Sequence, residues 1–137
     1  MDKIDSLETI GFPMIETGEE AGLRWGIALA PRMSAVNGYV QLSFAHPLYE
    51  KFFDPDFDYL DDLNLDAHGG ITYFRDGIIG FDTLHFRDVW TDEALAEVGG
   101  KNDPSYPPII SSDSFYWTRR LIIEETKHLA RALADME

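Results

Sequence analysis

The stretch AHGGITYFRDGIIGFDTLHF, residues 67–86, carries the strongest strand pattern in the sequence. Apolar, aromatic and β-branched residues recur in 67–74 and in 78–86, and Arg75-Asp76-Gly77 separates the two runs. Two such runs around a short turn that contains glycine are typical of a β-hairpin. We therefore expect an antiparallel sheet that includes this hairpin.

Two more strands are expected before the hairpin. Residues 23–30 alternate weakly and stop at Pro31, and residues 38–43 follow an Asn37-Gly38 turn. Residues 1–22 are polar and rich in Gly and Glu, which favours a loosely ordered lead-in with a short turn of helix. Residues 46–66 interleave acids with aromatics and predict a loop with short helical turns.

Helices are expected after the hairpin. Thr91 is a suitable N-cap for a helix over 92–98, Gly99-Gly100 is a suitable stop, and a loop should follow over 101–108. Residues 113–136 contain neither Gly nor Pro, which predicts a long C-terminal helix. Its core stripe is expected at seven-residue spacing, at Phe115, Ile122, Leu129 and Met136.

These elements predict an α+β fold, with an antiparallel sheet of about four strands and the long C-terminal helix packed on one face. A length of 137 residues, 45% of them hydrophobic, suits one core. We expect a single domain over 1–137, with the sheet in 23–88 and the helix in 113–136.

The composition excludes several classes of site and partner. Without cysteine, neither a disulfide, a thiolate zinc site nor a cysteine nucleophile can form. A net charge of −14 opposes direct nucleic-acid binding and favours basic partners or simple solubility. No signal peptide or membrane-spanning stretch is evident, so we expect a cytoplasmic protein without membrane contact. The oligomeric state stays open, with a homodimer among the options.

Four polar residues make the hairpin unusual, and the geometry of its turn determines which of them meet: His68, Asp82, His85 and Asp88. If Asp76-Gly77 is a two-residue turn, Arg75 pairs with Ile78 and His68 faces His85, with Cβ atoms about 5 Å apart. If the connection has three residues, with a bulge at Gly77, His68 faces Leu84 and Asp82 lies diagonally beside it.

These residues suggest two kinds of chemistry. His68 and His85 are candidate catalytic acid and base, with Asp82 or Asp88 as the orienting carboxylate. His68, His85 and Asp88 are candidate ligands of a divalent metal, which is the one cofactor that the sequence suggests. The alternative is that each histidine is a half-buried strand residue bonded to a backbone carbonyl.

Two adjacent glycines, Gly69 and Gly70, mark a place where another group approaches the backbone, either a ligand or an element packed against the strand. With Tyr73, Asp88 and Trp90 they form the candidate ligand-binding set. The acidic run 54–66 lacks the glycine and the closing glutamate of an EF-hand loop, and none of the common nucleotide-binding or hydrolase motifs occurs.

The segments GYVQLSFAHPLY, FDYLDDL, AHGGITY and GFDTLHFRD resemble a group of short proteins encoded by tailed bacteriophages and prophages. The resemblance runs from Gly38 to Asp88 and continues loosely into the terminal helix, and HGGITY with GFDTLHxxD is its most specific part. It implies a phage accessory protein in the bacterial host, and by analogy an antagonist of host defence. It implies no mechanism.

Three functions are consistent with these observations. The first is binding of a small polar, nucleotide-like ligand or a host protein at the hairpin site. The second is a small hydrolase or lyase, metal-dependent or not, that uses His68 and His85. The third is an acidic mimic of DNA, in which the acids of 54–66 occupy a basic groove on a host nuclease.

Overall fold

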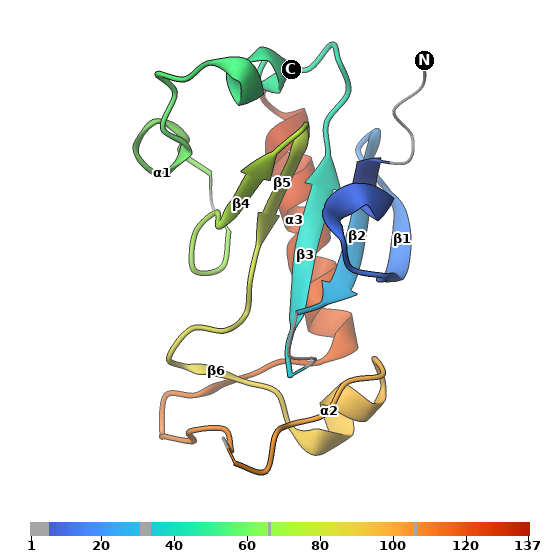
Figure 1. Cartoon of the computed structure of the whole chain (residues 1–137), viewed down its shortest axis with the longest axis vertical. Coiled ribbons are helices and arrows are strands. Elements are labelled where there is room, and N and C mark those ends of the chain that lie inside the picture. Colours follow the sequence, from blue (N-terminus) through green and yellow to red (C-terminus); the bar gives the residue numbers. More distant parts are fainter. Residues whose placement is uncertain (1–5, 31–33, 66, 106) are drawn as a thin grey trace.

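Five strands form one antiparallel sheet in the computed structural model, which describes residues 6–30, 34–65, 67–105 and 107–137 (Figure 1). Across the sheet they run in the order β1 (Met14–Glu20), β2 (Leu23–Leu29), β3 (Val36–Gln41), β5 (Ile78–Phe81) and β4 (Tyr73–Arg75). The expected α+β class is confirmed, with one strand more than the four expected.

The additional strand is β1, and it corrects the expectation of a loosely ordered lead-in over 1–22, of which residues 1–5 lie outside the described residues. Glu20 pairs with Leu23 across a two-residue turn in which Ala21 and Gly22 both have positive φ, 54° and 84°. Such turns match the twist of an antiparallel pair. The acids of β1 suit an edge strand, where charge discourages pairing with other chains. They also give the segment a loop-like composition, so the sequence did not predict a strand here.

Strand β3 begins earlier than expected. Asn37 and Gly38 do not turn the chain but pair with Ala28 and Ile27 of β2. A Cβ at Gly38 would collide with the hydroxyl oxygen of Thr126, so this position lets the C-terminal helix lie close to the sheet. The glycine therefore has a packing role in the strand and no turn role.

The C-terminal helix is α3 (Arg119–Ala134), and it covers one face of the sheet over β2 and β3 (Figure 1). It starts later than expected, because the Thr118 hydroxyl accepts the Leu121 N–H and caps it. Phe115 and Met136 lie beyond its ends and are 42% and 39% exposed, so they do not belong to the core stripe. Its buried residues are Ile122, Thr126, Leu129, Ala130 and Leu133.

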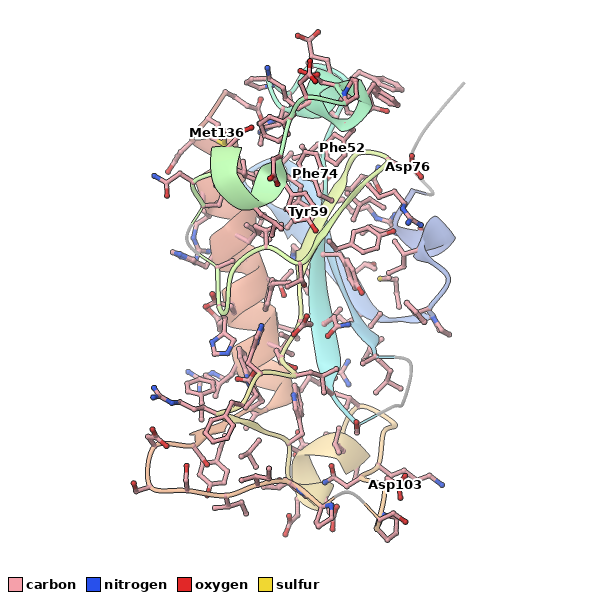
Figure 2. The ribbon with its side chains drawn as sticks, turned by 60° about the vertical axis from the view of Figure 1, so that its left-hand side comes forward. Phe52, Tyr59, Phe74, Asp76, Asp103 and Met136 are labelled. Carbon is pink, nitrogen blue, oxygen red and sulfur yellow. The ribbon has the colours of Figure 1, made fainter. Side chains whose placement is uncertain are left out.

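The opposite face of the sheet carries a smaller cluster. A 3-10 helix, η1 (Ser6–Ile10), places Leu7 against Tyr39 and Ile78, and Tyr73 packs at its border. At one end of the sheet, η2 (Tyr49–Phe53) and α1 (Tyr59–Asp62) are the short helical turns expected within 46–66. Figure 2 shows their Phe52 and Tyr59 gathered on Phe74, at the end of the molecule opposite Asp103.

A second, smaller layer lies beyond the other end of the sheet (Figure 1). Here β6 (Asp88–Val89) pairs in parallel with β7 (Phe115–Tyr116), and α2 (Asp92–Ala96) follows the expected N-cap, Thr91. Residues 113–118 are therefore not helical, because the Phe115 and Trp117 N–H groups donate to Arg87 and Val89 carbonyls. Within the described part of the chain, no helix has the length and hydrophobicity to span a bilayer.

Candidate functional site

The hairpin β4–β5 has the two-residue turn. Arg75 pairs with Ile78, and Asp76 and Gly77 have φ values of 54° and 86°, as a turn of this kind requires. The bulged three-residue register is therefore wrong. The ladder ends when the Thr72 N–H donates to the Gly80 carbonyl, so 67–71 and 82–86 are not strands and His68 does not face His85 across a ladder.

Loops bring the two histidines together instead. His68 lies in a turn closed by the Gly70 N–H and the Ala67 carbonyl. Gly69 in this turn has a φ of 69°, and a Cβ there would collide with the imidazole of His85. The centroids of the two imidazoles lie 5.8 Å apart. Gly69 is thus the place of close approach that the glycine pair predicts, and the approaching group is His85.

The carboxylate of Asp88 is the centre of the site. Oδ1 accepts the Trp117 indole N–H at 2.9 Å and lies 2.6 Å from His68 Nε2, while Oδ2 accepts the His85 backbone N–H at 2.9 Å and lies 3.0 Å from His85 Nδ1. The side chain of Asp88 is only 1% exposed. We call this set, Asp88 with His68, His85 and Trp117, the Asp88 hub.

Electrostatics favour the charged form of this buried carboxylate. Burial alone raises the pKa of Asp88, because it removes water from the anion. Three hydrogen bonds lower the pKa, from the Trp117 indole, the His85 backbone amide and the His68 ring, and the electrostatic attraction of His68 adds to them. Together they outweigh burial, so the pKa of Asp88 lies below the ordinary value of an aspartate. Asp88 is therefore an ionised acceptor that holds both imidazoles in fixed orientations.

Asp82 belongs to His85 and not to His68. Its Oδ1 accepts the Leu84 N–H at 3.1 Å and lies 3.5 Å from His85 Nε2. The two ring nitrogens of His85 thus point at two carboxylates, Asp82 and Asp88. This arrangement orients the ring, which is the role expected of Asp82, although for the other histidine.

Aromatic rings enclose His68 on one side. Its ring meets Trp117 edge to face with centroids 4.7 Å apart, and the ring of Phe115 lies 5.6 Å away. Trp117 in turn stacks on Trp90, with centroids 6.2 Å apart. Trp90 is 2% exposed and its indole N–H donates to the Thr83 hydroxyl. This candidate ligand-binding residue therefore contributes to the Asp88 hub by packing against Trp117.

An open groove of about 510 Å³ runs beside the Asp88 hub, between β7 and one face of α3. His68 and Phe115 lie on its wall, and the Glu125 carboxylate, also on the wall, accepts the His68 backbone N–H at 3.0 Å. We call it the His68 groove. Its lining is His68, Phe115, Trp117, Leu121, Glu124, Glu125, His128 and Arg131.

The remaining candidate residues do not line the His68 groove. Tyr73 is not part of the site, because its ring packs edge to face on Tyr39, in the cluster beneath η1. Gly70 has a φ of 86°, with open space where a Cβ would lie, so it serves the turn. Two acids of the acidic run cap their own turns: Asp58 accepts the Leu60 N–H, and Asp62 accepts the Asp58 N–H.

Two important members of the site escaped the sequence analysis, Trp117 and Glu125. Both are distant in sequence from the hairpin, and residues 113–136 read as a continuous helix with a core stripe. Thr118 was the available signal for a later helix start, because Thr is a favoured N-cap residue. That shift alone would have freed 113–117 to pair with another segment.

Comparison with known proteins provides no identity for the chain: no family model, no curated protein and no solved structure matches it significantly.

Proposed function

We propose that this protein binds a small polar ligand in the His68 groove, with His68 as the residue that recognises it. The observation that carries the proposal is the fixed orientation of an imidazole that is 28% exposed and borders an open groove. Asp88 holds Nε2, and among the residues that the structure describes none hydrogen-bonds to Nδ1. That nitrogen is available to a ligand.

The charge of the groove narrows the class of ligand. Glu124 and Glu125 supply two carboxylates, whereas the guanidinium of Arg131 already pairs with Glu20 at 2.8 Å. With the net charge of −14, this lining disfavours polyphosphates, because like charges repel across a low-dielectric wall. A ring system with neutral or cationic polar groups fits better, with the partly exposed ring of Phe115 as its stacking partner.

A nucleoside or a related heteroaromatic metabolite combines these features, whereas a nucleoside triphosphate does not. On the resemblance to short phage proteins, we propose that the protein acts in the infected bacterium. There, by sequestering a small signalling molecule, it would antagonise host defence. A basic host protein is the other partner that the acidic surface suggests.

A titration with nucleosides and with their mono- and triphosphates tests the proposal, read out by thermal shift and by NMR chemical shifts of labelled histidine. We expect a nucleoside-type ligand to shift the His68 signals, and triphosphates to bind more weakly. Phe115→Ala should reduce the affinity about three- to tenfold, as loss of a stacking partner does. The matched control is Phe53→Ala, an exposed ring at the other end of the molecule. No His68 shift with any of these compounds would refute the proposal.

The 2.6 Å contact between His68 Nε2 and Asp88 Oδ1 favours a second candidate, a proton-transfer catalyst. A carboxylate that orients an imidazole is the arrangement of a general base. Chromatography of bound ligands after incubation separates the two candidates. Recovery of intact ligand indicates a binding protein, and turnover that His68→Gln abolishes indicates an enzyme.

A further inference from the structure

We propose that His68, His85 and Asp88 form a binding site for a divalent transition metal of the zinc and iron class. Each offers one ligand atom, and the three atoms lie within 4.8 Å of one another. Two imidazoles and a carboxylate are donors that these ions accept readily, whereas Mg²⁺ prefers oxygen ligands. The inference rests on the same Asp88 hub as the proposed function and adds a cofactor to it.

The carboxylate is positioned by donors that a metal would leave in place. The Trp117 indole N–H binds Oδ1 and the His85 backbone N–H binds Oδ2, both at 2.9 Å. Neither bond involves an imidazole, so both persist if a metal ion replaces the imidazole protons that now face Asp88. Hydrogen bonds of this kind orient metal-binding carboxylates in known sites.

The distances require only a small adjustment. His68 Nε2 and His85 Nδ1 lie 2.6 Å and 3.0 Å from the Asp88 oxygens. Ligand atoms bind zinc at about 2.0–2.2 Å in a tetrahedron, so neighbouring ligand atoms are roughly 3.3–3.5 Å apart. Each nitrogen therefore lies about 0.3–0.9 Å closer to the oxygen that it faces than a tetrahedral site requires, and the three ligand atoms, all within 4.8 Å of one another, would have to close around the ion. Both rings are partly exposed to solvent, 28% for His68 and 37% for His85.

Asp82 stands behind His85 as an orienting carboxylate. It lies 3.5 Å from Nε2, the nitrogen that does not face Asp88. A proton on Nε2 leaves the lone pair on Nδ1 free for a metal, and a carboxylate behind a metal-binding histidine favours that tautomer. Gly69 lies so close to the same ring that a Cβ there would collide with it. Asp82 is thus a positioning residue for the metal site.

Three protein donors leave a coordination position open. Sites with two histidines and one carboxylate keep that position for water or a ligand, in contrast to the closed four-ligand sites that only stabilise a fold. Here His68 is shared with the groove, so the open position would lie beside the proposed ligand.

Calorimetric titration of the metal-free full chain with Zn²⁺, Co²⁺ and Mg²⁺ tests the site, with the visible absorption of Co²⁺ as a second readout. We expect one Zn²⁺ or Co²⁺ per chain and no Mg²⁺ binding. His68→Gln and His85→Gln should each lower the Zn²⁺ affinity at least about tenfold, and Asp82→Asn about tenfold, as loss of an orienting group does. Asp113→Asn, an exposed carboxylate paired with Arg87, is the matched control and should change nothing.

Absence of Zn²⁺ binding to the wild type would overturn the inference. So would a Zn²⁺ affinity that stays at the wild-type value in both histidine variants, which would indicate an adventitious ion only. Circular dichroism checks that the variants fold. If His68→Gln does not fold, the Zn²⁺ affinity of His85→Gln decides the test. Nucleoside titrations in EDTA and with Zn²⁺ separate the two proposals. No Zn²⁺ binding by a chain that still binds nucleosides in EDTA rejects the metal site alone, and Zn²⁺ binding by a chain that binds no nucleoside under either condition rejects the proposed function alone.

Discussion

The indole of Trp117 donates its N–H to Oδ1 of Asp88 at 2.9 Å, across 29 positions of the chain. This bond ties the segment before α3 to the segment after the hairpin, and it occupies the same oxygen that faces His68. The position of the candidate site therefore depends on Trp117, a residue with no proposed catalytic or metal-binding role.

Trp117→Phe should lower the free energy of unfolding by about 1.5–3 kcal/mol, the usual worth of a hydrogen bond to a charged group, beyond the loss of packing. Denaturant unfolding measures it. Trp25→Phe is the matched control, because the Trp25 Nε1 is buried with no partner among the described residues. Equal losses in the two variants would mean that the indole bond to Asp88 contributes nothing.

Asp88→Asn should destabilise the protein in a pH-dependent way. Since folding lowers the pKa of Asp88, its carboxylate stabilises the fold above the unfolded pKa of about 3.9, and that stabilisation disappears as the pH falls through the lower folded value. The difference in unfolding free energy between wild type and variant should thus be largest near neutral pH and shrink in acid. A difference that grows in acid would contradict the assignment.

Gly69→Ala and Gly70→Ala form a matched pair. Both positions have positive φ, which costs alanine about 1–2 kcal/mol, but only at Gly69 does the added methyl collide with the His85 ring. We expect Gly69→Ala to lose about 1–3 kcal/mol more than Gly70→Ala, as overpacking does. Thermal unfolding of the two variants, with NMR signals of His85, measures this. Equal stability would show that the ring does not rest on the glycine.

Ala21→Asn should stabilise the protein by about 0.5–1 kcal/mol, because Asn tolerates the positive φ of the β1–β2 turn better than Ala. The same change at the exposed helical residue Ala96 should destabilise it, since Asn is a poorer helix former. Guanidinium unfolding curves of both variants provide the comparison. A stabilising effect at both positions would point to solubility and not to turn geometry.

Local signals in the sequence predict much of this fold. The turn Asp76-Gly77, the cap Thr91 and the gap-free helix each follow from residues within a few positions of one another. Edge strand β1 escaped because Glu19 and Glu20 suit solvent as well as they suit a sheet edge. The start of α3 was misplaced because the N-cap Thr118 was not recognised and because the segment before it is held extended by Arg87 and Val89, which are distant in sequence.

The candidate site shows the same division. Its residue types were predicted, and His68, His85, Asp82 and Asp88 do lie together, but the two histidines meet through loops and not across a strand ladder, and Asp82 contacts His85 and not His68. Register cannot be extended past Thr72, where the ladder ends. The pairing of His68 with Asp88 arises from two turns and a short parallel ladder, and no periodicity encodes such a contact.

The parallel ladder of β6 and β7 has only two residue pairs, and the contacts that assemble the Asp88 hub connect positions 20 and 29 apart in sequence. Two residue pairs are few beside the six and four pairs that hold β3 on its two sides, so this end should open first in the native state. Amide exchange at Trp117 should therefore be faster than in β3. A molecule bound in the His68 groove would slow amide exchange at Trp117, so the exchange rate at this position would detect binding.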